Sequence, residues 1–92
     1  MDADGNPEHP GDLAAQLELS LDNLKAALAA ADMTLANVVR LNMYTTDVGK
    51  LFKHNAVLTD RFGDSRYATT VLGVAHLPAP QLLVMLEATA VD

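Results

Sequence analysis

The sequence contains no cysteine and no tryptophan, and it has only two phenylalanines and two tyrosines among its 92 residues. Without cysteine, disulfides and thiol chemistry are excluded, and a zinc site would need histidine and carboxylate ligands alone. Half of the residues are hydrophobic, which is enough for one small packed domain. Because aromatic rings are scarce, its core has to be built from Leu, Val, Ala and Met.

Basic residues are also scarce, since six Lys and Arg stand against twelve Asp and Glu and give a net charge of −6. Phosphate backbones need clustered basic side chains, so a nucleic-acid partner is disfavoured. No apolar run approaches the roughly 20 residues of a membrane span, and the acidic, polar start is unlike a secretory signal. We therefore expect a cytoplasmic protein without nucleic-acid or membrane partners.

The three histidines, His9, His54 and His76, are scattered along the chain. No pair of them has the spacing of metal ligands on one helix face, so we expect no metal site. The five glycines are isolated and do not form a phosphate-binding loop. The sequence has no Ser-His-Asp arrangement either, and it predicts no cofactor.

The first eleven residues, 1–11, combine three acidic residues with two Pro and two Gly. Such a segment buries little apolar surface, and it is predicted to be a flexible acidic arm. The rest of the chain shows no internal repeat and no segment that reads as a second domain. Residues 12–92 are therefore predicted to form a single domain.

A helix is predicted from about Asp12, which serves as its N-cap, to about Asp32. Gln16, Glu18 and Asp22 are assigned to its solvent side. Its core-facing stripe follows the 3.6-residue period and consists of Leu13, Leu17, Leu21, Leu24 and Leu28.

A strand is predicted over residues 37–46, with successive side chains on opposite faces. One side is assigned Val39, Leu41 and Met43, and the other Val38, Arg40, Asn42 and Tyr44. Asp47 caps a second predicted helix over about 48–62, which Gly63 ends. Its apolar stripe is predicted to consist of Val48, Leu51, Phe52, Leu58 and Phe62, with Asn55 on the same side.

The last part of the chain is predicted to form two strands, 67–76 and 82–91, joined as a hairpin by the proline-containing turn 77–81. One side of the second strand is entirely apolar and consists of Leu82, Val84, Leu86, Ala88 and Ala90. The other side is mainly apolar and consists of Leu83, Met85, Glu87, Thr89 and Val91. Two helices can cover only one face of this sheet. The composition therefore predicts an α+β layer whose second face is covered by another subunit.

Three segments of the chain carry a resemblance to a known family. LDNLKAALAAADMTLANVVRLNMYTTD is similar to a first helix and following strand, HNAVLTDRF to a second helix, and VAHLPAPQLLVMLEATAV to a closing hairpin. Leu77-Pro78 and Glu87-Ala88 stand at signature positions of that hairpin. In this order over residues 13–91, the segments resemble the Rid family, the YjgF-like imine/enamine deaminases also labelled endoribonuclease L-PSP.

The resemblance implies a chorismate-mutase-like, YjgF-like α+β fold that assembles as a homotrimer. It also implies ligand clefts between subunits that take a small carboxylate or an imine-like molecule. Members usually carry an N-terminal hairpin before the first helix, and here Met1 falls after it. The resemblance therefore predicts an N-terminally shortened member, and the shortening would expose a strand edge.

Two positions depart from the pattern of the active deaminases in the family. The family arginine in the first strand of the hairpin corresponds to Thr69, and the water-activating glutamate corresponds to Met85. A threonine cannot bind a carboxylate bidentately as a guanidinium does, and a thioether cannot shuttle protons. The catalytic residues are therefore unknown. The ligand-binding candidates are Thr69, Thr70, Arg66, Asn55 and Met85.

Three functions remain open on these residues. The first is an oligomeric protein that binds a small metabolite between subunits without arginine-dependent imine hydrolysis. The second is an active deaminase in which Arg66, three residues before Thr69, replaces the family arginine. The third is a non-enzymatic interaction protein whose exposed edge strand recruits another chain. A further prediction pairs Arg40 with a carboxylate, either Glu87 or one across a subunit contact.

Overall fold

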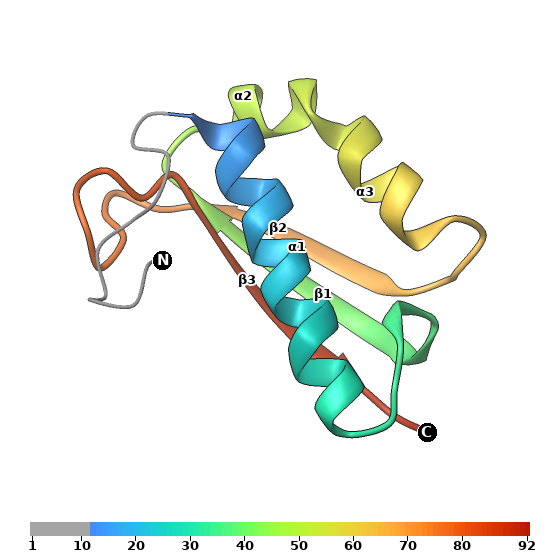
Figure 1. Ribbon diagram of the computed structural model, residues 1–92. Helices are drawn as coiled ribbons and strands as arrows, with labels where there is room; N and C mark the ends of the chain where they lie inside the picture. Colours follow the sequence, from blue (N-terminus) through green and yellow to red (C-terminus); the bar gives the residue numbers. More distant parts are fainter. Residues whose placement is uncertain (1–11) are drawn as a thin grey trace.

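The structure, a computed structural model, describes residues 12–92, so the predicted acidic arm at 1–11 lies outside the described residues (Figure 1). The order of helices and strands agrees with the α+β prediction. The elements are α1 (Leu13–Ala30), the 3-10 helix η1 (Leu35–Asn37), β1 (Val38–Thr45), α2 (Val48–Lys53), α3 (Asn55–Phe62), β2 (Ala68–Gly73) and β3 (Val84–Ala90).

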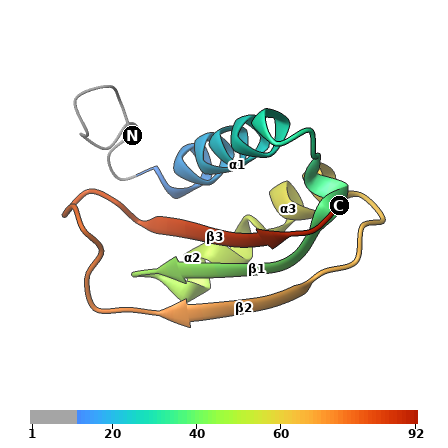
Figure 2. The same ribbon diagram turned by 90° about the horizontal axis from the view of Figure 1, so that it is seen from below.

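Within residues 12–92 the three strands form one mixed sheet in the order β2-β1-β3 (Figure 2). β1 pairs in parallel with β2 and antiparallel with β3. The predicted hairpin between the last two strands is therefore wrong, because each of them pairs with β1. The intervening segment crosses the end of β1, where Val74 N donates to Thr45 O at 2.8 Å and Thr46 N donates to Leu83 O at 3.3 Å.

Helix α1 forms as its sequence predicts. The Asp12 side chain accepts a hydrogen bond from Ala15 N at 3.0 Å, which satisfies one of the unpaired amides of the first turn. The predicted leucine stripe faces the sheet: Leu13, Leu17, Leu21 and Leu28 are buried, and Leu24 is half-buried. This stripe is the largest single contribution to the core.

Gln16 is buried at 3% exposure, so its assignment to the solvent side of α1 is wrong. Its Oε1 accepts from Leu83 N at 2.7 Å, and its Nε2 donates to Gln81 O at 2.8 Å. The segment before β3 runs against the first turns of α1 and brings these two backbone groups with it. A buried amide that meets both groups removes the cost of leaving them unpaired.

The predicted second helix is broken at His54 into α2 and α3. Asp47 caps α2 as predicted, through a bond from Lys50 N at 3.0 Å. Within α2 the buried residue is Leu51, and its neighbour Phe52 is 59% exposed, so the assignment of Phe52 to the apolar stripe is wrong. Gly63, at φ 57°, ends α3 in the left-handed conformation that favours glycine.

A β-bulge between Val38 and Arg40 shifts the alternation at the start of β1. Val38 is buried at 1% exposure, whereas Val39 is 43% exposed. The predicted assignment of these two valines is therefore reversed. From Leu41 onward the predicted alternation is correct, since Leu41 and Met43 are buried.

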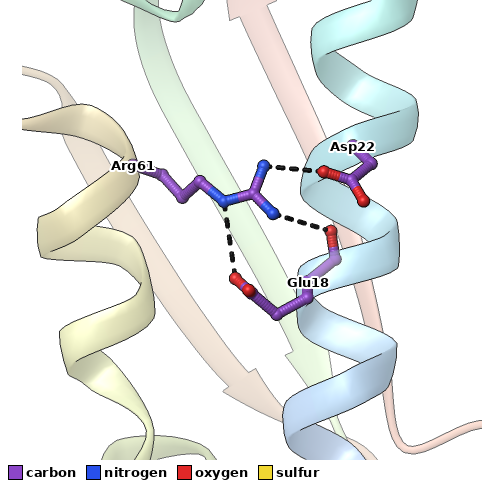
Figure 3. A network of polar contacts seen from close by, with 3 residues as sticks. All are labelled: Glu18, Asp22 and Arg61. Carbon is purple, nitrogen blue, oxygen red and sulfur yellow. Dashed lines mark hydrogen bonds and ion pairs between the residues drawn. The ribbon is translucent and has the colours of Figure 1, made fainter.

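Arg61 of α3 ties that helix to α1 (Figure 3). Its Nη1 lies 2.8 Å from Asp22 Oδ1, its Nε lies 3.4 Å from Glu18 Oε1, and its Nη2 donates to Glu18 O at 3.5 Å. The two carboxylates stay about half exposed, in agreement with their predicted solvent side. Contacts at this level of exposure contribute up to about 1 kcal/mol, so they orient α3 more than they stabilise it.

Helices α1, α2 and α3 all lie on the same face of the sheet (Figures 1 and 2). This confirms the prediction of a helical layer on one face, although residues 12–92 contain three α-helices instead of the two expected. The core lies between this layer and the inner side of β1 and β3, which contributes Leu41, Met43 and Val84. The opposite face of the sheet is not covered by any described residue.

Candidate functional site

The candidate site begins with the uncovered side of the sheet, which we call the open face. Because side chains alternate along a strand, the neighbours of buried Leu41 and Met43 point to it. In the pairing register, Asn42 lies beside Thr70 and Glu87, and Tyr44 beside Leu72 and Met85. The open face consists of Arg40, Asn42, Tyr44, Ala68, Thr70, Leu72, Met85, Glu87 and Thr89.

Glu87 is the centre of a hydrogen-bonded cluster on the open face. Asn42 Nδ2 donates to Glu87 Oε1 at 3.0 Å, and the Tyr44 hydroxyl donates to the same oxygen at 3.1 Å. The register brings Asn42 directly opposite Glu87, and Tyr44 follows two residues later on the same side of β1. Two donors from one strand therefore fix a carboxylate on the next.

The two hydrogen bonds change the titration of both partners. The pKa of the Glu87 carboxyl is lowered, chiefly by the bond from Asn42 and next by the bond from Tyr44. The pKa of the Tyr44 phenol is raised, chiefly because it donates to that carboxylate. At neutral pH the cluster therefore presents an ionised carboxylate beside a protonated phenol. It is an acceptor site and not a source of protons.

Tyr44→Phe is expected to raise the pKa of the Glu87 carboxyl towards its ordinary value, because one of its two donors is lost. The bond from Asn42 remains, so the recovery is partial. In the unaltered protein the pKa of the Glu87 carboxyl is lower in the folded chain than in the unfolded chain. The ionised carboxylate therefore stabilises the fold fully above the unfolded pKa, and this contribution is lost as pH falls through the folded pKa. NMR titration of the Glu87 side chain measures the change. Thr89→Ala is the control, and an unchanged pKa in Tyr44→Phe would contradict the cluster.

The predicted pairing of Arg40 with Glu87 is wrong within the chain. Arg40 is exposed, and it makes no ion pair with any residue in 12–92. The register explains this, because Arg40 lies opposite Thr89 and leaves Glu87 to Asn42. Pairing of Arg40 across a subunit contact stays a prediction.

The open face is more polar than the sequence of β3 alone suggested, since β1 supplies an arginine, an asparagine and a tyrosine to it. Its apolar part is formed by Leu72, which is 48% exposed, and the half-buried Met85. The open face therefore mixes apolar side chains with a fixed carboxylate, unlike the mainly apolar core on the helical side.

The structure places the three strand candidates on two sides of the sheet. Thr70 lies opposite Asn42 and Met85 opposite Tyr44, so both belong to the open face, on either side of β1. Thr69 lies opposite buried Leu41 and therefore points to the helical side, where it remains exposed at the outer strand β2. The side chains of Thr69 and Thr70 therefore lie on opposite faces of the sheet.

The other two candidates lie in the helical layer and the loop that follows it. Asn55 is the first residue of α3, and it is exposed. Arg66 is exposed in the loop between α3 and β2, beyond the other end of that helix. The single chain does not gather Thr69, Thr70, Arg66, Asn55 and Met85 into one cluster. Their grouping in a cleft between subunits stays a prediction.

His54 lies at the junction of α2 and α3, where its N–H closes the end of α2. From Asp12 onward, the chain holds no group of three or more His, Asp or Glu side chains arranged to bind a metal ion. In the same part of the chain, no helix combines the length and the apolar character needed to cross a membrane. The cytoplasmic location stays a prediction.

A pocket of about 330 Å³ lies between α1 and β3. Apolar residues of α1 and of the segment that contains β3 line it, together with Ser20 and Asn23 at the helix. The apolar lining consists of Leu24, Leu82, Val84, Met85, Leu86 and Ala88. One signal for this pocket was present in the sequence, because Leu24 belongs to the leucine stripe of α1. That β3 would lie beneath this helix was not visible from the sequence.

Sequence reasoning also missed Asn42 and Tyr44 as partners of Glu87. Their spacing of two residues placed them on one side of the strand, and this was the available signal. The identity of the opposing strand decides what they contact, and the predicted hairpin paired β3 with the wrong strand.

The structure therefore defines a class of protein: an α+β domain of the YjgF-like fold, with a helical layer on a mixed sheet and a polar open face. The family model described as Endoribonuclease L-PSP matches residues 1–92. The chain belongs to this family, the Rid or YjgF family, as its segments predicted.

Solved structures agree with this assignment. Rv2704 from Mycobacterium tuberculosis, of the YjgF/YER057c/UK114 family, is 40% identical with a TM-score of 0.82, covering 87% of this chain and 68% of its own. YyfB from Yersinia pestis, of the Rid protein family, is 36% identical with a TM-score of 0.86, covering 97% of this chain and 69% of its own.

Curated relatives extend beyond the part that this chain matches. The RutC family protein PH0854 from Pyrococcus horikoshii is 35% identical over 80 residues, which are 87% of this chain and 63% of the relative. The 2-iminobutanoate/2-iminopropanoate deaminase from Escherichia coli is 32% identical over 87 residues, covering 91% of this chain and 67% of the relative. This chain therefore corresponds to part of the family domain.

Proposed function

We propose that this protein binds a small carboxylate or imine-like metabolite in clefts between the subunits of a homotrimer, without arginine-dependent imine hydrolysis. The proposal rests on the pair of residues Thr69 and Met85, which by the resemblance to the family correspond to its arginine and its glutamate. The similarity to the iminobutanoate/iminopropanoate deaminase supports the ligand class.

The chemistry of Thr69 favours binding over catalysis. A guanidinium offers a planar pair of donors and a permanent charge to a substrate carboxylate. The Thr69 hydroxyl offers one donor without charge, which suits a weaker, neutral hydrogen bond to a ligand. Thr70 and Thr69 point to opposite faces of β2, so only one of them can belong to a given cleft.

The chemistry of Met85 leads to the same conclusion. Attack of water on an imine carbon needs a group that accepts a proton from the water, and a thioether does not do this at neutral pH. Glu87, two residues later on the same face, is held by Asn42 and Tyr44 with a lowered pKa. A lowered pKa makes Glu87 a weaker base than an ordinary glutamate, so it does not replace the family residue.

The open face supports the assembly. It exposes Leu72 and Met85 around the charged Glu87 cluster, with Arg40 nearby as a cation that is not paired within residues 12–92. In a threefold assembly built on this face, Arg40 of one subunit can meet the carboxylate of another. Burying the apolar part of this face adds core that a chain of 92 residues otherwise lacks.

The experiment is an assay of ammonia release from 2-iminopropanoate generated in situ, with the Escherichia coli deaminase as the positive control. We expect this protein to release ammonia no faster than the uncatalysed reaction, because neither the carboxylate anchor nor the base is present. Binding is measured separately, by titrating the protein with pyruvate, a stable carboxylate analogue.

The Arg66→Ala variant distinguishes a binding protein from an active deaminase in this assay. Turnover above background that is lost in Arg66→Ala and kept in Arg61→Ala would overturn the proposal and identify an active deaminase that uses Arg66. Arg61 is the matched control because it engages Glu18 and Asp22 on the helical layer. The absence of both turnover and pyruvate binding would equally contradict a ligand cleft of this class.

A further inference from the structure

Two arginines of the chain come close together where β1 and β2 begin. In the parallel register of these strands Arg40 lies opposite Ala68, and Arg66 precedes Ala68 by two residues. Two residues along a strand cover about 6.6 Å and neighbouring strands lie about 4.8 Å apart, so the two backbone positions are diagonal neighbours at roughly 8 Å. Side chains as long as arginine reach across such a diagonal.

The neighbours of Arg66 show on which side of the sheet it lies. Tyr67 is half-buried against the core and stacks on Phe62 of α3, with ring centroids 4.4 Å apart. Exposure alternates over residues 65–68 as it does in a strand, with Arg66 and Ala68 exposed on either side of Tyr67. Because successive side chains of an extended chain point to opposite sides, Arg66 lies on the open face with Ala68.

The open face changes in character along its length. At one end Arg40 lies between Ala68 of β2 and Thr89 of β3, whose side chains are too short to cover a guanidinium group. The Glu87 cluster follows two residues further along β1, and the apolar part of the face lies two residues beyond that. The two arginines therefore form a cationic end of the open face.

This cationic end stands out in an acidic protein with six basic and twelve acidic residues. The third arginine, Arg61, is neutralised by Glu18 and Asp22 and joins two helices. Arg40 and Arg66 meet no carboxylate of residues 12–92, and both have permanent charge. Two like charges in this arrangement repel each other, and an anion placed between them turns the repulsion into attraction.

We propose that Arg40 and Arg66 bind one small oxyanion between them on the open face, and that this oxyanion is the carboxylate of the metabolite. Each guanidinium offers a planar pair of N–H donors. A carboxylate has about four lone-pair sites on its two oxygens, so it can accept from both pairs at once. A protein carboxylate that meets Arg40 alone does not satisfy this arrangement.

The site deepens the proposed function by naming a carboxylate anchor other than the family position. Thr69, which corresponds to the family arginine by resemblance, points to the helical side of the sheet. An anion held by Arg40 and Arg66 lies on the opposite side, where Thr70 is the neighbouring hydroxyl of β2. The oxyanion site rests on the two arginines, and only its carboxylate class rests on the proposed function.

Calorimetric titration with pyruvate tests the site in the full-length protein. Arg40→Ala and Arg66→Ala each remove charge-assisted hydrogen bonds and are expected to weaken pyruvate binding about tenfold or more. Lys53→Ala is the matched control, because it removes the same charge from an exposed position at the end of α2. The control is expected to keep the unaltered affinity. Unaltered affinity in either arginine variant overturns the proposal.

Arg40→Lys and Arg66→Lys separate bidentate binding from a general effect of charge. Lysine keeps the positive charge but lacks the planar pair of donors. Both variants are therefore expected to bind pyruvate more weakly than the unaltered protein and more tightly than the alanine variants. Lysine variants with the unaltered affinity would mean that the charge alone attracts the ligand, and this result overturns bidentate binding.

NMR of the arginine Nε–H groups gives an independent readout. Pyruvate is expected to shift the signals of Arg40 and Arg66 and to leave that of Arg61 in place, because Arg61 is held by carboxylates of α1. A separate titration with inorganic phosphate distinguishes the source of the oxyanion. Shifts with phosphate and none with pyruvate would support the oxyanion site but overturn the carboxylate class of the proposed function. No shift with either anion overturns the site itself.

Two other occupants of the arginine pair give different results. If a carboxylate of another subunit holds Arg40, Arg40→Ala lowers the mass measured by light scattering and Arg66→Ala does not. If Asp2, Asp4 and Glu8 occupy the pair, replacing all three by their amides shifts both arginine signals before any anion is added. Either result overturns the proposal, which expects the unaltered mass in both alanine variants and unshifted signals in the amide variant.

Discussion

Replacing Gln16 with leucine is expected to lower the free energy of unfolding by about 2–3 kcal/mol. Leucine fits the apolar surroundings of this buried position, but it leaves Leu83 N–H and Gln81 C=O without the partners they have now. Leaving a buried donor or acceptor unpaired costs more than an average hydrogen bond contributes. The loss is large for a small domain, whose total stability is of the order of 5 kcal/mol.

Urea denaturation followed by circular dichroism measures this change. Gln81→Ala is the control, because only the backbone oxygen of Gln81 accepts from Gln16, and its own side chain is exposed. The control is expected to stay within about 0.5 kcal/mol of the unaltered protein. Equal effects of the two substitutions would mean that Gln16 does not hold the start of β3 against α1.

Leu21→Ala is expected to destabilise the domain by about 3 kcal/mol. Leu21 is fully buried in the middle of the α1 stripe, between the helix and the sheet. Truncation removes apolar contacts and leaves a cavity that the rigid strands cannot close. With a core built mainly from leucine and valine, few neighbouring side chains are flexible enough to fill the space.

Leu24→Ala is the matched control on the same helix. Leu24 is half-buried at the pocket beside β3, so the same truncation removes less buried surface and is expected to cost about 1 kcal/mol. Denaturation of both variants at a concentration where the chains are dissociated compares them directly. A cost for Leu24→Ala equal to that for Leu21→Ala would show that the pocket is closed in the single chain.

These two substitutions act on the part of the protein that positions everything else. Gln16 and the leucines of α1 fix the helix over β3, and β3 in turn carries Met85 and Glu87 on the open face. A change in the helical layer therefore reaches the open face. Comparing stability with assembly separates a residue that holds the fold from one that makes a contact between chains.

The sequence by itself determined most of the local structure. The period of the leucines, the cap at Asp12, the cap at Asp47 and the stop at Gly63 are all found where the sequence predicts them. Each of these features depends on residues within one or two turns of each other, so the chain encodes it without reference to any distant segment. The order of helices and strands predicted an α+β layer, and the family resemblance added the YjgF-like fold; the structure confirms both.

The structure corrected the sequence wherever a distant segment was involved. Gln16 is buried because the residues before β3 cover it, and Phe52 is exposed because α2 packs on the core through its neighbour Leu51. The β-bulge near Val38 exchanged the predicted sides of Val38 and Val39. It too depends on a distant segment, because it arises from the pairing of β1 with β3.

The tertiary structure alone decided which strand lies in the middle, and with it the candidate site. Periodicity shows which side of an element is apolar, but it does not show which element will cover that side. Placing β1 between β2 and β3 gave Glu87 its partners Asn42 and Tyr44 and separated Thr69 from Thr70. Pairing between strands far apart in the chain depends on the packing of the whole domain, so the sequence predicted the strands without predicting their neighbours.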